Sequence, residues 1–271
     1  MPRAHINGVN LHYEVSGQGR AIVLCHGYTA SHQVWVHQLP VLAGDYQVVT
    51  VDLRGHGSSD APSSVAAYSI PTLASDIRYL LEHLGISACC FVGHSLGGFV
   101  ALQLALDHPQ LIGALVLVGT SSGPIDIPGY AELRMQLEKI VQRDGMEAAF
   151  EHNALHNPMA RKRFEKFPEL RQTVKRRMLE TSLDGYIYAA QAMSQRPVLT
   201  GRLGEISAPT LVVVGEEDNT FRQPSEILAN GIPHARLHVV PEATHTPQEE
   251  TPEVFNKMIT GFLAEEFGGD L

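Results

Sequence analysis

The stretch Gly93-His94-Ser95-Leu96-Gly97 sets a serine between two glycines at the point where a strand-like run gives way to a helical one. An apolar run, Ala88–Val92, precedes it, and a run with helical character, Phe99–Leu106, follows it. Glycines on both sides of a serine permit a tight strand-to-helix turn that exposes the hydroxyl at its tip. Small residues in such a turn can also serve packing alone. In this context, however, the pattern predicts that Ser95 is a nucleophile.

On both sides of this turn, short apolar runs alternate with helical patterns through most of the chain. Asn7-Gly8 is a strong hairpin signal between the two runs that come first. Helices are predicted over residues 72–84 and 99–106, and over a last helix with Thr251 as its cap and Pro252 at its first position. The predicted strands are Arg3–Ile6, Val9–Val15, Ala21–Cys25, Tyr46–Val51, Cys89–Val92, Leu111–Val118, Thr210–Val214 and Arg236–Val240. The alternation predicts an α/β fold with a mostly parallel eight-stranded sheet.

The segment from residue 122 to residue 200 differs from the rest, because it has helical patterns, such as Glu132–Val141 and Leu170–Leu179, but no strands. We interpret it as a helical cap inserted into a core formed by residues 1–121 and 201–271. Between Arg134 and Arg177 there are 11 Lys or Arg and 6 Asp or Glu. This excess could attract anionic substrates or pair with an acidic body. Pairing is favoured, because contiguous basic residues point in several directions around a helix.

The composition limits the classes of function. The chain has 271 residues, 44% of them hydrophobic, and a net charge of −9 without a basic tail, which argues against a nucleic-acid partner. The first residues lack the apolar core of a signal peptide, and no stretch is long and apolar enough for a membrane span. With three cysteines, a cytoplasmic protein with reduced core thiols is expected. No clustered metal-ligand spacing occurs, so we expect neither a metal nor an organic cofactor.

A serine nucleophile needs a neighbouring base, and position selects among the 14 histidines. His245 follows the last predicted strand, so it belongs to the carboxyl edge of the sheet, where the Ser95 turn also lies. His26 and His56 occupy carboxyl ends as well and are the main rivals. His94 adjoins the serine, but neighbours in a tight turn generally point in different directions. His245 is the predicted base.

The base in turn needs a carboxylate that fixes its tautomer. Asp218 follows the strand Thr210–Val214, in a short loop that also contains the candidate surface acids Glu216 and Glu217. Asp126, after an earlier strand, is another candidate. Asp218 is favoured because the loop after the penultimate strand usually carries the acid. The chain order is then Ser95, Asp218, His245, as expected for a nucleophile elbow.

Two backbone amides are predicted to form an oxyanion hole. The Leu96 amide opens the helix after the serine, and the Tyr28 amide follows His26-Gly27 at the end of an earlier strand. A glycine there lets the backbone approach a substrate oxygen. Gly27, with His26, Gly93 and Gly97, is therefore assigned a supporting role.

Taken together, these motifs resemble the α/β-hydrolase family, and within it capped serine hydrolases of the 3-oxoadipate enol-lactonase and carboxylesterase types. The resemblance runs from Ala21 to the last helix. It implies that the loop after Asp52 is structural. Thr244 departs from the glycine often found there in relatives. Dehalogenases and epoxide hydrolases carry an aspartate nucleophile and dienelactone-type relatives a cysteine, so Ser95 separates the chain from all three. The matching motifs are His26-Gly27, Asp52–Ser59, Gly93–Gly98, Gly215–Asp218, Thr244-His245 and Glu250–Glu253.

The resemblance implies a serine hydrolase that cleaves a small carboxylic ester or lactone through an acyl-enzyme on Ser95. A second possibility keeps the same residues but breaks a carbon–carbon bond of a vinylogous diketo acid, or acts as a cofactor-free haloperoxidase or perhydrolase. A third is a receptor that retains the fold and binds a ligand without turnover. Apolar cap residues, together with Trp35, are expected to lie mostly in the core.

Overall fold

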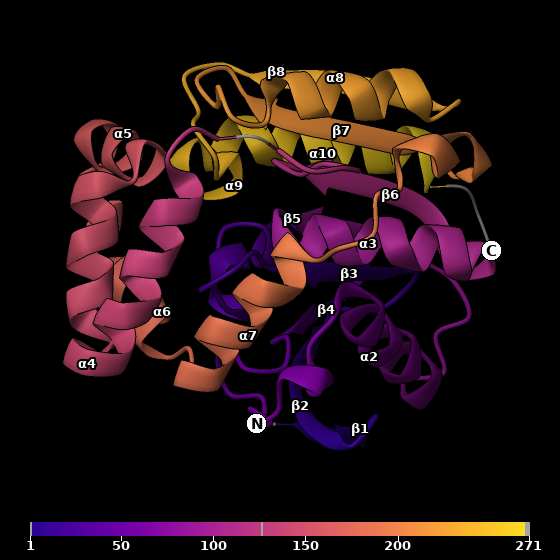
Figure 1. Cartoon of the computed structure of the whole chain (residues 1–271). Coiled ribbons are helices and arrows are strands. Elements are labelled where there is room, and N and C mark those ends of the chain that lie inside the picture. The colour runs from indigo at the N-terminus through magenta and orange to yellow at the C-terminus, as the bar shows by residue number, and fades with distance from the viewer. Residues whose placement is uncertain (1, 126, 269–271) are drawn as a thin grey trace.

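The computed structural model describes residues 2–125 and 127–268, and a single eight-stranded sheet lies at its centre (Figure 1). The strand order is β1-β2-β4-β3-β5-β6-β7-β8, and β2 alone runs against its neighbours. The predicted α/β fold is confirmed. The strands are β1 (Arg3–Ile6), β2 (Val9–Ser16), β3 (Ala21–Cys25), β4 (Gln47–Val51), β5 (Cys89–His94), β6 (Ile112–Val118), β7 (Thr210–Gly215) and β8 (Ala235–Val240).

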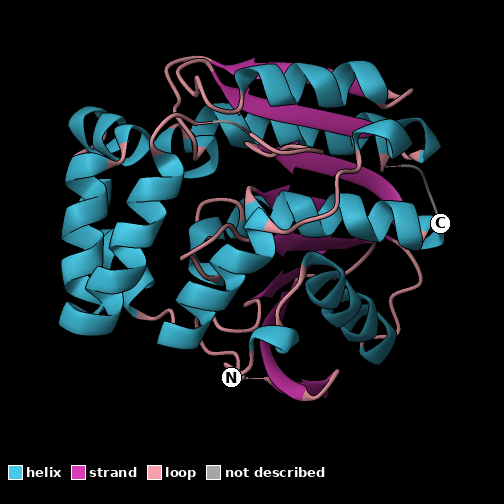
Figure 2. Cartoon of the chain, in the orientation of Figure 1, coloured by secondary structure: helices cyan, strands magenta, loops and turns pink. Residues whose placement is uncertain are grey.

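Helices cover both faces of the sheet (Figure 2). One core cluster joins α2, α3 and α8 to one face, and a second joins α1 and α10 to the other. Because side chains alternate along a strand, Cys89 and Phe91 of β5 belong to the first cluster and Cys90 and Val92 to the second. The helices are α1 (Leu39–Leu42), α2 (Ile70–His83), α3 (Leu96–Asp107), α4 (Tyr130–His156), α5 (Pro158–Lys166), α6 (Leu170–Leu179), α7 (Leu183–Ser194), α8 (Arg222–Gly231), α9 (Pro247–Glu250) and α10 (Pro252–Glu266).

Helix ends differ from the sequence prediction where a local side chain decides them. Helix α2 begins at Ile70 rather than Thr72, because the Ser69 hydroxyl accepts a hydrogen bond from the Thr72 amide at 3.1 Å. Thr251 is the N-cap residue of α10 and Pro252 its first residue, as predicted, but the Thr251 hydroxyl makes no capping hydrogen bond. It donates instead to the Pro247 carbonyl at 3.3 Å.

Helices α4–α7, hereafter the inserted helices, lie between β6 and β7 in the chain and have a small core of their own. In Figure 1, α4, α5 and α6 stand together at one end of the sheet, near α9, and α7 leads from them back toward α3. Leu137, Phe150 and Tyr186 are buried there, whereas Leu155 is 63% exposed and lies outside any core. Trp35 is buried in the core, as predicted. Nowhere in residues 2–125 or 127–268 is there a helix with the length and apolarity that crossing a membrane requires.

Candidate active site

Ser95 lies at a strained turn between β5 and α3. Its φ of 51° and ψ of −109° are unusual for a residue with a side chain, and strain of this kind costs roughly 1–3 kcal/mol. The turn is fixed by the Ser95 amide, which donates to the Val118 carbonyl at 2.9 Å. A Cβ on Gly93 would lie 2.3 Å from the Gly97 carbonyl oxygen, and one on Gly97 would lie 2.4 Å from that of Cys25. Both glycines are therefore required by close backbone approach.

This crowding predicts a large effect for Gly93→Ala. The added methyl would meet backbone rather than a flexible side chain, so the strand-to-helix junction must distort. We expect the melting temperature to fall by at least 5 °C, or the soluble yield to collapse. Gly261→Ala is the matched control, because a Cβ there meets nothing within 4 Å and a helical alanine is favoured over glycine. Equal melting temperatures for Gly93→Ala and wild type would refute the crowding argument.

His245 and Asp218 are brought together across 27 residues of chain. The His245 Nδ1 donates to the Asp218 Oδ2 at 2.8 Å, which leaves the Nε2 unprotonated in the neutral ring. The Asp218 Oδ1 accepts the Phe221 amide at 3.1 Å, so both oxygens of this buried carboxylate are engaged. The Phe221 ring also stacks on the imidazole, with centroids 4.7 Å apart. These contacts fix the tautomer and the orientation of the His245 ring.

His245 also lies close to two segments next to Ser95: His94, which precedes the serine, and Gly119, at the end of the neighbouring strand. The His94 Nε2 donates to the His245 carbonyl at 3.0 Å, and the centroids of these two rings are 4.9 Å apart. A Cβ on Gly119, whose φ is +52°, would lie 3.0 Å from the His245 Nδ1. Gly119 follows Val118, the residue that accepts the Ser95 amide. The three residues predicted to act together thus converge at the carboxyl edge of the sheet.

The rival histidines have other partners. The His26 Nδ1 donates to the Gly27 carbonyl at 2.7 Å, and the His26 Nε2 accepts the Leu53 amide at 3.0 Å. The His56 Nδ1 donates to the Arg54 carbonyl at 3.1 Å. Burial lowers the pKa of His26, of His94 and of His56, the last to about 3. These buried, neutral rings therefore brace the backbone and are not paired with a carboxylate by any of these bonds.

The other candidate acids are separated from His245. The Glu216 carboxylate accepts the Glu242 amide at 3.0 Å and is exposed. The Glu217 carboxylate is bound by Lys162 and Lys166 of α5. Asp126 lies outside the described residues. Asp218 is thus the acid that the described structure places on the His245 ring.

Two amides lie free beside Ser95. Within the part of the chain that the structure describes, neither the Tyr28 nor the Leu96 amide donates to a backbone or side-chain acceptor. A Cβ on Gly27 would lie 3.3 Å from the Ser95 Cβ, so this backbone passes directly over the serine. His26 holds the Gly27 carbonyl, and the opposite end of that trans peptide, the Tyr28 amide, points away from His26. The Tyr28 and Leu96 amides are therefore placed so that both could donate to one substrate oxygen next to Ser95.

The Tyr28 side chain connects this loop to the inserted helices. Its hydroxyl donates to the Tyr186 carbonyl at 2.5 Å and accepts from the Arg134 Nη1 at 3.2 Å. The Arg134 guanidinium also lies 5.2 Å from the centroids of both tyrosine rings. Burial raises the pKa of Tyr28, so the phenol stays neutral. Helices α4 and α7 therefore cover the candidate oxyanion loop.

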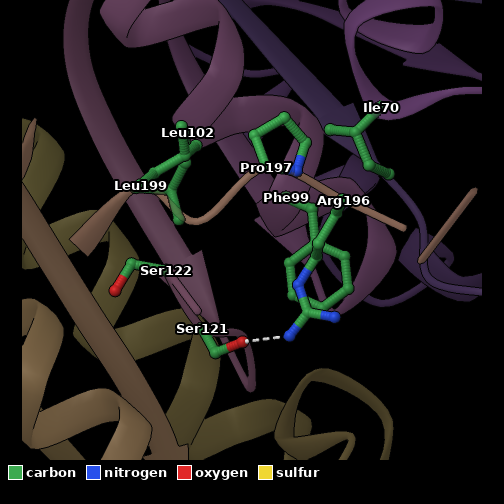
Figure 3. A pocket seen from close by; sticks show the side chains of 8 residues that line it. All are labelled: Ile70, Phe99, Leu102, Ser121, Ser122, Arg196, Pro197 and Leu199. Atoms are coloured by element: carbon green, nitrogen blue, oxygen red, sulfur yellow. Dashed lines mark hydrogen bonds between the residues drawn. The ribbon is translucent and has the colours of Figure 1, made fainter. Parts of the chain in front are cut away.

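A small cavity lies behind the turn, between α3 and the chain that returns from α7 (Figure 3). Its volume is about 10 Å³, enough for one water molecule at most, so it is not a substrate pocket. The Arg196 guanidinium lines it, donates to the Ser121 Oγ at 3.1 Å and lies 4.3 Å from the Phe99 ring centroid. A cavity of about 450 Å³ lies among α4, α5 and α6, and its lining contains none of the candidate catalytic residues.

The loop after Asp52 is held together by that carboxylate. The Asp52 oxygens accept the His32 and Ser58 amides and lie 2.9 Å from the Nδ1 atoms of His12 and His32. A group of two histidines and an aspartate can ligate a metal, and within the described residues this is the only group with that potential. Here, however, both Nδ1 atoms are already bonded to the carboxylate. This network agrees with the structural role that the sequence predicts for the loop.

The buried histidines predict acid lability. An unfolded histidine titrates near pH 6.5, whereas folded His56 resists protonation down to about pH 3. The unfolded state therefore binds the proton first, and stability falls as pH drops below 6.5, by about 1.4 kcal/mol per pH unit for this ring. Urea unfolding measured at several pH values between 6.5 and 4.5 should show that the free energy of unfolding falls less steeply with pH in His56→Gln than in wild type. His5→Gln, at an exposed position, is the control, and an unchanged slope in His56→Gln would contradict the assignment.

The chain is similar over nearly its whole length to several known hydrolases. A thermophilic esterase from Thermogutta terrifontis is 29% identical, with a TM-score of 0.87 and alignment of 98% of this chain and 99% of that one. An enol-lactonase from Burkholderia xenovorans is 27% identical, with a TM-score of 0.85 and coverage of 97% and 100%. Mouse epoxide hydrolase 4 is 27% identical over 298 residues, covering 96% of this chain and 78% of its own. A family model described as the alpha/beta hydrolase fold matches residues 20–252, and the chain belongs to that family of hydrolases.

Proposed function

We propose that this protein is a serine hydrolase that cleaves a small carboxylic ester or lactone through an acyl-enzyme on Ser95. The observation that carries the proposal is the 2.8 Å hydrogen bond between His245 and Asp218, on an imidazole packed against His94, the residue that precedes a strained serine. A serine at that position becomes reactive when a positioned imidazole accepts its proton. The structure thus supports a reaction class, acyl transfer, more strongly than any one substrate.

In the proposed mechanism the His245 Nε2 takes the Ser95 proton as the Oγ attacks the substrate carbonyl. The Tyr28 and Leu96 amides hold the negative oxygen of the tetrahedral intermediate, each contributing about 3 kcal/mol. Asp218 stabilises the imidazolium, which then protonates the leaving alcohol. Water, deprotonated by the same imidazole, attacks the acyl-enzyme and releases the acid. The inserted helices, acting as a cap, would shield these steps from bulk water.

Ser95 favours this reaction over epoxide opening. Epoxide hydrolases as a class carry an aspartate nucleophile, and here a serine occupies the corresponding turn. The esterase and the enol-lactonase among the similar structures act on carboxylic ester bonds, open or cyclic, according to their names. A carboxylic ester or lactone is accordingly the proposed substrate class.

The proposal is tested by a panel of p-nitrophenyl esters of graded acyl length and of γ- and δ-lactones, with perhydrolysis and a vinylogous diketo acid as further assays. We expect kcat/KM for at least one short ester or lactone to exceed the values for the other two reactions by a factor of about 100. Faster cleavage of the diketo acid would move the assignment to carbon–carbon hydrolysis. No turnover and no labelling by a fluorophosphonate would favour a ligand receptor.

A further inference from the structure

The turn that carries His245 is held by one buried carboxylate, that of Glu250 in α9. It accepts the Thr244 amide at 2.6 Å and the Thr244 hydroxyl at 2.7 Å. It also accepts the Thr246 hydroxyl at 2.6 Å and the Thr246 amide at 3.3 Å. These four bonds bracket His245 from both sides. A glycine at position 244 could not supply the second of them, so Thr244 adds a constraint on this turn.

The negative charge of the Glu250 carboxylate is balanced by a cation from the inserted helices. The Glu250 side chain is fully buried, and a buried charge is costly without a partner. The Arg163 Nε of α5 lies 3.1 Å from the Glu250 Oε1, and the Arg163 Nη2 lies 2.9 Å from the Glu249 Oε2. Arg177 of α6, itself almost fully buried, forms a second ion pair with Glu249. Arg163 thus contacts the carboxylate that holds the His245 turn, and Arg177 pairs with the glutamate next to it.

The loop that carries Asp218 also contacts helix α5. The Lys162 Nζ lies 3.1 Å from the Glu217 Oε2 and donates to the Glu217 carbonyl at 3.1 Å. Lys166, one helical turn later, pairs with the same carboxylate. These pairs are partly exposed and are weakened by salt, unlike the buried pair of Arg163 and Glu250. Helix α5 therefore contacts both loops, the one with the candidate acid and the one with the candidate base.

We propose that Arg163 is a positioning residue that acts through Glu250, so that docking of the inserted helices sets the placement of His245 for catalysis. This inference rests on the proposed function, because it assigns His245 a role in the reaction. Arg163 and Glu250 touch neither Ser95 nor His245 by any bond described here, and they act through Thr244 and Thr246. A displacement of about 1 Å at a catalytic group can reduce the rate 100-fold. A geometric role at this distance is therefore measurable.

The test uses Arg163→Met, which keeps an unbranched apolar stem but removes the guanidinium and its charge, and Glu250→Gln, which keeps the shape of the carboxylate. Arg161→Met is the matched control: Arg161 lies on the same helix, is largely exposed, and pairs only loosely with Glu165 at 3.7 Å. A fluorophosphonate, allowed to react to completion, counts the folded sites, and kcat per labelled site is measured well below each melting temperature. We expect kcat to fall about 10- to 100-fold in both variants, with KM changed less than threefold and Arg161→Met unchanged.

The pH profile of kcat/KM separates positioning from folding. Asp218 from the β7 loop and His94 from β5 contact His245 itself, and the elements packed next to its turn carry Glu249 and Glu250 of α9 and the two arginines of the inserted helices that pair with them. Arg163→Met removes a cation from this group of charges, so the acidic limb of kcat/KM should move to higher pH. Glu250→Gln removes an anion, so the limb should move to lower pH. Arg163→Lys, which keeps the charge, should restore part of kcat and the wild-type limb.

The inference is overturned if Arg163→Met and Glu250→Gln keep the wild-type kcat per labelled site and the wild-type acidic limb. It is also overturned if all lost activity is explained by fewer labelled sites, since that indicates a folding role alone. If neither variant folds, Arg163→Lys decides the question. A lysine has one ammonium group in place of the two nitrogens with which Arg163 meets Glu249 and Glu250, so wild-type kinetics in Arg163→Lys would count against positioning. Failure of wild type itself to be labelled at Ser95 would instead overturn the proposed function.

Discussion

Replacing Ser95 with alanine is expected to lower kcat for the best ester substrate about a million-fold, to the rate that binding and oxyanion stabilisation alone sustain. The reason is that the hydroxyl forms the covalent intermediate, so its loss disables the serine, histidine and aspartate as a unit. The fold should be unaffected, because the turn is held by the backbone bond from residue 95 to Val118 and by the adjacent glycines. Steady-state kinetics and a thermal melt of the same preparation measure both effects.

Ser225→Ala is the matched control for this change. Ser225 is a buried serine on α8 whose hydroxyl has no hydrogen-bond partner among the described residues. We expect its kcat to stay within threefold of wild type. Ester hydrolysis by purified Ser95→Ala above a hundredth of the wild-type rate would mean that another group is the nucleophile.

Asp218→Asn should give the second-largest effect, a loss of about 10⁴ in kcat with little change in KM. The amide matches the size of the carboxylate, but its NH₂ can donate to the His245 Nδ1, which favours the tautomer that cannot accept the serine proton at Nε2. The negative charge that stabilises the imidazolium is lost as well. Kinetics with a short p-nitrophenyl ester provide the measurement.

Glu216→Gln is the control, since it removes an exposed carboxylate two residues earlier in the same loop. Its kcat should be close to that of wild type. Similar losses in Asp218→Asn and Glu216→Gln would indicate that the loop, and not the Asp218 carboxylate, supports activity.

The fold and the candidate residues could be predicted because their signals are local. The Asn7-Gly8 turn specifies a backbone with positive φ that few other residues adopt, and the two glycines around Ser95 permit the close backbone approach that its turn requires. The position of His245 after β8 and of Asp218 after β7 follows from strand order alone, since parallel strands end at one edge. The structure brings these two together, while their roles in catalysis remain predictions.

What the sequence could not predict depends on contacts between distant segments. Phe221 packs on the His245 ring from the start of α8, and nothing in its neighbourhood marks it as different from an ordinary core residue. The charge excess in residues 134–177 correctly suggested pairing with the acidic body, as Lys162 and Arg163 show. Which acids they meet depends on how α5 docks against the loops after β7 and β8. Composition gave the sign of the interaction but not its location.

The central claim, that a hydroxyl at the β5–α3 turn attacks the substrate, is tested most directly by peptide-mapped mass spectrometry after incubation with a fluorophosphonate. The account predicts one adduct per chain, on Ser95, formed rapidly by wild type and at least 1000-fold more slowly by His245→Ala. An adduct on any other residue, or equal rates of Ser95 labelling with and without the histidine, would contradict it.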